Sequence, residues 1–174
     1  GTPTPIPAPA GLVRWWPADG NADDVVGDND GTLQNGATFA PGKVGQAFKF
    51  DGIDDYIALA DQPRLEDGFT FSAWINQTEL RFANPQTIFN NNQFDLHPPS
   101  AFDGPEEARF IQCLKDANVL HLCHNSESTH TPEKWVHVAV TWDTTFLELY
   151  VDGIQDRSVG RAAGLNPNTV EARI

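Results

Sequence analysis

The feature that most constrains this chain is a two-residue period of apolar side chains in several short segments. In WVHVAVTW (Trp135–Trp142) every second position is Val or, at the end, Trp, and FTFSAWI (Phe69–Ile75) alternates in the same way. A two-residue period places one set of side chains on one face of an extended strand. No segment of helical length shows a clean 3.6-residue period. The alternation therefore predicts strands with one buried face.

Shorter runs of the same kind are separated by clusters of Gly, Asp, Asn and Pro. They are QAFKF (Gln46–Phe50), DYIALA (Asp55–Ala60), RFIQCL (Arg109–Leu114), VLHLC (Val119–Cys123) and LELYV (Leu147–Val151). Such spacing is typical of an all-β chain folded as an antiparallel two-sheet β-sandwich. Residues Arg81 to Ala108 break the rhythm, and we expect strands interrupted by long loops there, with one short strand at Thr87–Asn90.

The length and charge of the chain narrow its organisation and its partners. Residues 1–10, GTPTPIPAPA, read as a stiff linker of polyproline type, which implies a neighbouring domain before it. Residues 11–174 are long enough for one domain with a sizeable core. The net charge of −13 disfavours nucleic acid and anionic membrane surfaces. No apolar run approaches the ~18–20 residues that a membrane span needs, so we expect no membrane insertion.

A strand followed by a loop rich in Asp, Asn and Gly occupies Gly11–Gly36, GLVRWWPADGNADDVVGDNDGTLQNG. Calcium takes roughly 6–8 oxygen ligands, which such loops can supply. Asp and Asn also occur in loops because they cap turns. The loop alone leaves both interpretations open. A second acidic cluster, Asp51, Asp54 and Asp55, is interpreted as a hairpin turn.

The two cysteines, Cys113 and Cys123, bracket a segment that is predicted to form a hairpin. A cross-strand disulfide and two free thiols are equally compatible with this spacing. A zinc site that also uses His121 and His124 is disfavoured, because no paired C-x-x-C is present and the two histidines point to opposite faces of a regular strand.

Some aromatic side chains are predicted to lie outside the core. Trp74, Trp135 and Tyr150 fall on the face opposite the aliphatic stripes of their strands. Exposed tryptophan rings bind sugars by stacking on their apolar faces, so Trp74 and Trp135 are candidate carbohydrate-binding residues. The other tryptophans that we interpret are assigned to the core: Trp15, Trp16 and Trp142.

The sequence does not carry the usual signs of catalysis. Glu148 is the only acid inside a clearly predicted strand, and it has no acidic partner two residues away. The Glu-x-Asp-x-x-Glu pattern of glucanases, a G-x-S-x-G elbow and an H-E-x-x-H motif are all absent. We therefore expect that the chain is not an enzyme.

Five motifs in order resemble the laminin G-like, concanavalin A-like jelly-roll domains of extracellular bacterial proteins. They are WWPADGNADD…GDNDGTLQNGATF, PGKVGQAFKFDGIDDYIAL, FTFSAWI, KWVHVAVTWD and LELYVDG. The resemblance implies a structural Ca²⁺, with Asp24 at the family's recurrent Asp and Asp30 as the second choice of ligand. The family's closing Ile-Asp-Glu-Val-like strand has no match in Glu171–Ile174, so we expect the closing strand to be missing and the first strand's edge to be unpaired.

These observations together predict a secreted or cell-surface carbohydrate-binding, lectin-like module with a structural calcium ion. Its expected partner is a glycan or polysaccharide, with other extracellular protein domains as possible further partners. The alternative is a structural or adhesion module that contacts protein or spaces other domains. A glycoside hydrolase is a third, less favoured interpretation.

Overall fold

The computed structural model describes residues 8–61, 68–80, 86–91, 94–100, 109–115, 121–143, 145–160 and 172–173. These residues form strands, turns and loops, and no helix occurs among them. The chain divides into two compact units, Gly1–Asp61 and Gln62–Ile174. The all-β prediction is confirmed, whereas the single domain over residues 11–174 stays a prediction. The proposed linker lies largely outside the described residues.

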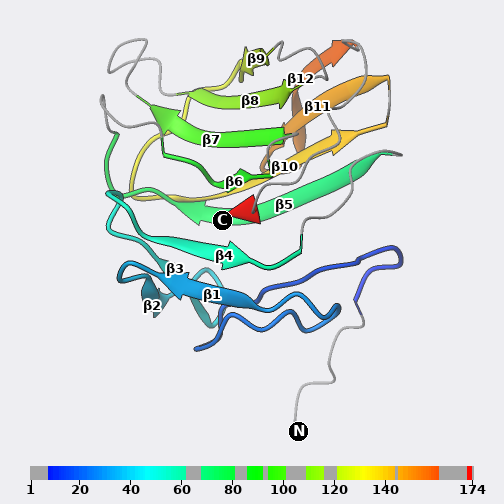
Figure 1. The fold of residues 1–174 in the computed structure, drawn as a ribbon. Coiled ribbons are helices and arrows are strands. Elements are labelled where there is room, and N and C mark those ends of the chain that lie inside the picture. Colours follow the sequence, from blue (N-terminus) through cyan, green and yellow to red (C-terminus); the bar gives the residue numbers. More distant parts are fainter. Residues whose placement is uncertain are drawn as a thin grey trace, which may run out of the picture. The chain divides into compact units, whose positions relative to one another are not determined.

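The first unit contains two antiparallel strand pairs (Figure 1). One joins β1 (Gly31–Gln34) to β4 (Tyr56–Leu59), and the other joins β2 (Thr38–Pro41) to β3 (Gln46–Lys49). In the second pair, Phe39 lies opposite Phe48 with ring centroids 5.7 Å apart.

Gly31 marks the tightest packing of β1 against β4. A Cβ atom at this position would lie 2.5 Å from Cγ2 of Ile57, which is fully buried. Because Ile57 is β-branched and enclosed by the core, its methyl group has little room to move aside. Only glycine fits this approach.

The second unit contains a four-stranded sheet in the order β12-β11-β10-β5 (Figure 1). The strands are β5 (Phe69–Asn76), β10 (Trp135–Trp142), β11 (Phe146–Val151) and β12 (Ile154–Gly160). β5 and β10 pair along their whole length, from Trp135 opposite Asn76 to Trp142 opposite Phe69.

The other strands of the second unit follow one another in the order β13-β6-β7-β8-β9. They are β6 (Phe89–Asn90), β7 (Phe94–Ser100), β8 (Arg109–Lys115), β9 (His121–Asn125) and β13 (Ala172–Arg173). The pairs β13–β6, β6–β7, β7–β8 and β8–β9 are all antiparallel.

The core of the second unit lies between these two layers. The inward positions of β10 and the first two of β11 are buried: Val136, Val138, Val140, Trp142, Leu147 and Leu149. Two aromatic contacts join the layers, with ring centroids 5.2 Å apart for Phe69 and Phe94 and 4.9 Å apart for Phe71 and Phe89. The predicted sandwich and the alternation that implied it are both confirmed.

Three local expectations need correction. Leu12–Pro17 is not part of a strand ladder, and its backbone contacts the following loop instead. β7 was not predicted, because it contains Pro98 and Pro99; the register shifts there, between His97 and Ser100, as expected where proline cannot donate to a ladder. The end of the chain does form a strand, β13, which pairs with β6.

The Gly31→Ala variant is expected to lose roughly 1–3 kcal/mol of unfolding free energy, because the added methyl group overpacks the core around Ile57. Gly160→Ala is the matched control, since its Cβ would meet nothing closer than a ring carbon of Phe146 at 3.8 Å. Equilibrium urea unfolding of the two variants measures the difference. Equal midpoints would show that Ile57 can move aside.

Candidate functional site

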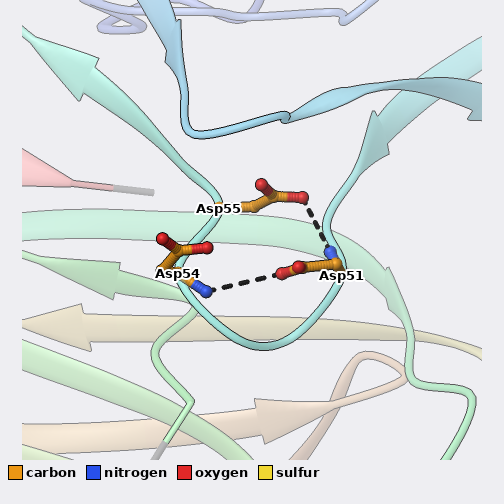
Figure 2. A group of neighbouring side chains, drawn as sticks. All are labelled: Asp51, Asp54 and Asp55. Carbon is orange, nitrogen blue, oxygen red and sulfur yellow. Dashed lines mark hydrogen bonds between the residues drawn. The ribbon is translucent and has the colours of Figure 1, made fainter.

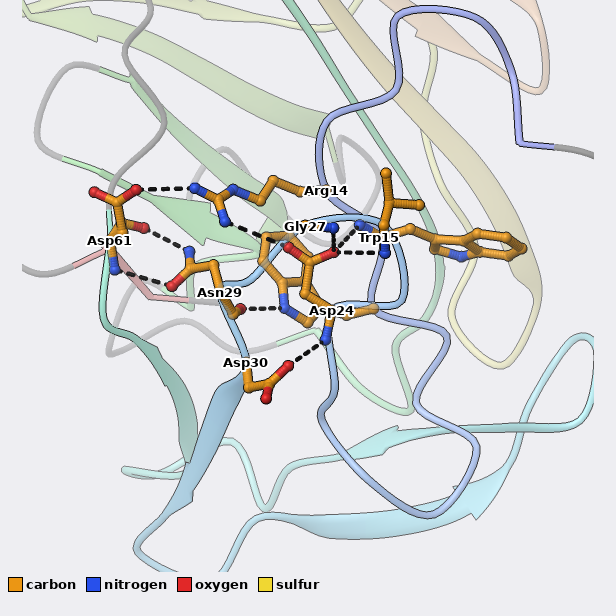
Figure 3. Close-up of polar contacts among 9 residues, drawn as sticks. Arg14, Trp15, Asp24, Gly27, Asn29, Asp30 and Asp61 are labelled. Atoms are coloured by element: carbon orange, nitrogen blue, oxygen red, sulfur yellow. Dashed lines mark hydrogen bonds and ion pairs between the residues drawn. The ribbon is translucent and has the colours of Figure 1, made fainter.

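Asp24 organises the loop that follows the first two tryptophans (Figure 3). Its side chain is fully shielded from solvent. Oδ1 accepts backbone hydrogen bonds from Trp15 at 2.9 Å, Gly27 at 2.9 Å and Val26 at 3.2 Å. One buried carboxylate oxygen therefore holds both arms of the loop.

Arg14 neutralises the same carboxylate. Its Nη1 lies 3.5 Å from Asp24 Oδ2, and its Nη2 lies 2.9 Å from Asp61 Oδ2. The guanidinium thus bridges two carboxylates of the first unit, one enclosed and one exposed. Burying the charge of Asp24 is tolerable because it is paired and hydrogen-bonded.

Asn29 fixes the loop to the end of β4. Its side-chain Nδ2 donates to the Asp61 carbonyl at 2.6 Å, and its Oδ1 accepts from the Asp61 N–H at 2.9 Å. The indole Nε1 of Trp16 donates to the Asn29 carbonyl at 2.9 Å. The loop is held by this bidentate contact as well as by Asp24 (Figure 3).

The arrangement does not fit the calcium ion that was predicted at Asp24 and Asp30. Calcium needs carboxylate and carbonyl oxygens turned toward it. Oδ1 of Asp24 instead faces three N–H donors, and Oδ2 faces a guanidinium. Asp30 Oδ1 accepts the Asp24 N–H at 2.9 Å. The loop satisfies its carboxylates with protein donors, and a cation at Asp24 would have to displace Arg14.

The acidic cluster at the turn before β4 is also organised by its own backbone. Asp51, Asp54 and Asp55 place carboxylate oxygens within 4.8 Å of one another. Asp51 Oδ1 accepts from the Ile53 N–H at 2.7 Å. It also accepts from the Asp54 N–H at 3.4 Å, and Asp55 Oδ2 accepts from the Asp51 N–H at 2.8 Å (Figure 2). These contacts are those of a carboxylate-capped turn.

The predicted sugar-binding residues lie on one face of the four-stranded sheet. Trp74 of β5 stands opposite His137 of β10, with ring centroids 5.3 Å apart. Trp135 is paired with Asn76 and so occupies the diagonal position next to Trp74, at about 7–8 Å by ordinary strand geometry. This face is opposite the buried valines. The structure therefore brings Trp74 and Trp135 together.

Glu148 and Tyr150 of β11 share this outward face. The Tyr150 hydroxyl donates to Glu148 Oε2 at 2.8 Å. That hydrogen bond is the main cause that raises the pKa of Tyr150 above its ordinary value. The phenol remains protonated and acts as a donor at neutral pH.

The structure also places the two cysteines and the tryptophans that were assigned to the core. Cys113 is disulfide-bonded and lies opposite Cys123, the only other cysteine, in the β8–β9 register. A disulfide sulfur is not the thiolate that zinc requires, which removes the zinc alternative. The core assignment holds for Trp142, and Trp16 is half-buried. Trp15 is 46% exposed, so its core assignment is wrong. The loop uses the backbone of Trp15 and not its ring.

Comparisons with known proteins place this geometry in a family. The family described as the concanavalin A-like lectin/glucanases superfamily matches residues 51–172, more than half of the 174 residues. The chain belongs to this superfamily. The resemblance noted in the motifs is thereby confirmed.

Several known proteins are similar to this chain in sequence or in structure. Human pappalysin-1 is 26% identical over 156 residues, and the match covers 80% of this chain but only 9% of pappalysin-1. Domain 4 of the extracellular GH43 arabinanase AbnA from Geobacillus stearothermophilus, solved with arabinotriose, has a TM-score of 0.68 at 17% identity, covering 88% of this chain and 76% of that one. The binding domain of Paraclostridial Mosquitocidal Protein 1 has a TM-score of 0.71 at 14% identity, covering 86% and 40%.

The described residues contain no helix with the length and apolar character needed to cross a bilayer.

We predict that replacing Asp24 destabilises the protein in a calcium-independent way. Asp24→Ala leaves three backbone N–H groups without their acceptor, at a cost of about 2–4 kcal/mol. Asp28→Ala, in the same loop but exposed, is the control and should change little. Thermal melts in calcium and in chelator should coincide for the wild-type protein, whereas an upward shift with calcium that Asp24→Ala abolishes would restore the metal site.

The charge of Asp24 should also make stability depend on acid pH. Burial raises the pKa of this carboxyl, but hydrogen bonds from Gly27, Trp15, Val26 and Asn29 together lower it below its ordinary 3.8. A depressed pKa gives stability that is complete above the unfolded-state value and is lost as pH falls through the folded-state value. The difference in unfolding free energy between wild type and Asp24→Asn should therefore shrink below pH 3.8. A constant difference in urea unfolding at neutral and acid pH would contradict this.

Proposed function

We propose that this chain is an extracellular, non-catalytic carbohydrate-binding module. Its ligand stacks on the outer face of the four-stranded sheet formed by β5, β10, β11 and β12. It holds a larger protein on a glycan or polysaccharide surface.

The observation that carries the proposal is the aromatic group around Trp74. Trp74 is 47% exposed although it belongs to a strand that is paired along its whole length. An exposed indole beside a second ring offers a flat apolar surface of the kind that the C–H face of a sugar stacks on. Its position on a strand holds this surface rigidly, so little ordering is required when a ligand binds.

The comparisons support the glycan part of the proposal. One domain with the same fold belongs to an extracellular arabinanase and was solved with arabinotriose. The superfamily takes its description from lectins and glucanases. Fold alone does not give function, so the argument rests on the exposed aromatic side chains of this chain.

The outward positions of the sheet favour binding over hydrolysis. Canonical glycoside hydrolysis uses two carboxyl groups that flank the bond to be broken. Glu148 is the only carboxylate at an outward position in the paired register of β5, β10 and β11, and Asp156 of β12 instead accepts hydrogen bonds from the Glu127 and Ser128 N–H groups. The sheet lacks the second group that such chemistry would need there.

A protein-binding or adhesion module is the second candidate. The first unit exposes Val13, Val44 and Ile53 to solvent, and exposed apolar side chains can serve protein contacts. These three residues are far apart along the chain, and single exposed apolar residues are common on any surface. Trp15 and Val25 are also exposed, and a backbone hydrogen bond of 2.9 Å joins them. The aromatic group on the sheet is the more specific feature.

We predict that Trp74→Ala and Trp135→Ala each reduce glycan affinity by about tenfold or more, the usual effect of removing a central aromatic contact. Ile154→Ala is the control, because Ile154 is also exposed and belongs to the same sheet. Binding is measured on a glycan array and by affinity electrophoresis, with circular dichroism as the check on folding. Wild-type protein that binds no glycan would favour the adhesion module.

A further inference from the structure

We infer that Glu148 forms a second, hydroxyl-binding subsite on the same face, and that the ligand is a neutral oligosaccharide reaching from Trp74 to Glu148. This inference rests on the proposed carbohydrate-binding function and specifies the class of glycan. It assigns a role to Glu148, the one carboxylate at an outward position in the paired register of β5, β10 and β11.

The register fixes the outward position of Glu148. Glu148 is paired with Thr141 of β10 on one side and with Ser158 of β12 on the other. Its neighbours along β11, Leu147 and Leu149, are buried. Because side chains alternate along a strand, Glu148 must face away from the core.

The carboxylate is held by two short and two long contacts. Tyr150 OH donates to Oε2 at 2.8 Å, and Gln155 Nε2 donates to Oε1 at 2.8 Å. The hydroxyls of Thr141 and Ser158 lie 3.4 Å from Oε2 and Oε1. The short contacts fix the orientation of the carboxylate. The long ones exceed the usual O–H···O range, so a sugar hydroxyl can replace them at a normal distance.

The chemistry of this group matches a sugar hydroxyl. A carboxylate accepts hydrogen bonds and donates none, and Thr and Ser hydroxyls rotate to donate or accept. A sugar hydroxyl can donate to Glu148 while accepting from Thr141 or Ser158. Tyr150 adds an aromatic ring on the same outward side. The subsite thus combines a fixed acceptor with adaptable donors.

The distance between the two subsites sets a minimum ligand size. With strands about 4.8 Å apart and a rise of about 3.4 Å per residue, Trp74 and Tyr150 lie about 12 Å apart, and Trp74 and Glu148 about 17 Å apart. Between them the outward positions carry the short side chains of Ser72 and Ala139. A single sugar ring cannot reach both subsites, so the ligand contains several.

The charges on this face select a neutral ligand. No Lys or Arg occupies an outward position in the paired register of β5, β10 and β11, and Arg157 of β12 is paired with the buried Leu149 and contacts Glu127 at 3.1 Å. The whole chain carries a net charge of −13. A uronic acid or sulfated sugar would meet the Glu148 carboxylate with no cation to compensate for it, and like charges in contact oppose binding.

The first experiment measures charge selectivity by affinity electrophoresis. Gels contain arabinan, xylan, mannan or cellulose derivatives as neutral polysaccharides, and polygalacturonate as the acidic one. Wild-type protein should be retarded only by a neutral polysaccharide. Glu148→Gln should raise binding to polygalacturonate relative to the neutral ligand, whereas Asp28→Asn, which removes a charge in the first unit, should not. Stronger retardation of the wild type by polygalacturonate than by every neutral gel would overturn the inference.

The second experiment measures affinity against ligand length by calorimetry, with oligosaccharides of one to five units from the polysaccharide that binds. Wild-type affinity should rise about tenfold or more between the short and the long ligands. Glu148→Ala should remove this rise while keeping the affinity for short ligands, and Trp74→Ala should weaken both.

The outcomes separate the two proposals. Wild-type protein that binds no glycan removes the proposed function itself. Glycan binding that needs Trp74 but is the same in wild type and Glu148→Ala at every length leaves the function standing and overturns the Glu148 subsite. Circular dichroism and melting of each variant show that the comparison is made between folded proteins.

Discussion

The pairing of β5 with β10 along all eight residues is the constraint on which the rest of the second unit depends. Side chains alternate with a period of two, so a slip of one residue would exchange the two faces of the sheet. The buried valines of β10 and the aromatic contacts of Phe69 and Phe71 with the other layer exclude such a slip. The same register places Trp74, His137 and Trp135 together outside. The core therefore determines the face that we propose binds the glycan.

The first unit depends on a different feature, a charged side chain that is buried inside a loop. Asp24 supplies one oxygen to three N–H groups and the other to Arg14. A metal ion would hold the ends of such a loop together by coordinating oxygen atoms. Here the Asp24 carboxylate holds them together by accepting hydrogen bonds from N–H groups, and the Arg14 guanidinium neutralises its charge. Both a metal site and a buried carboxylate of this kind can form in an Asp-rich loop. The two arrangements differ in the charge of the central group, which is a cation in a metal site and the Asp24 carboxylate here. Which arrangement forms depends on the neighbour of the carboxylate, here Arg14, rather than on the Asp itself.

Features that depend on the local alternation of side chains could be predicted from the sequence, whereas features that depend on contacts between distant residues could not. Strict alternation identified β5 and β10 at nearly their observed bounds, and it identified the outward face that carries Trp74 and Trp135. The composition of the loop suggested calcium because Asp24 is visible in the sequence, but its contact with Arg14, ten residues earlier, is not. β7 was missed because Pro98 and Pro99 contradict local strand propensity, and pairing with β8 overrides it. Trp15 was misassigned because aromatic composition does not reveal which way a non-strand residue points.

The proposed binding face is built on strands, and this limits the kind of recognition that it can perform. Its rings and the Glu148 carboxylate are held at spacings set by the sheet, so little conformational entropy is lost when a ligand binds. The same rigidity prevents the face from closing over a ligand and excluding water. Exposed hydrogen bonds contribute little net free energy each, and stacking on one side of a sugar leaves its other side solvated. Affinity must then come from the number of sugars engaged, and an extended polysaccharide suits such a surface better than a single sugar does.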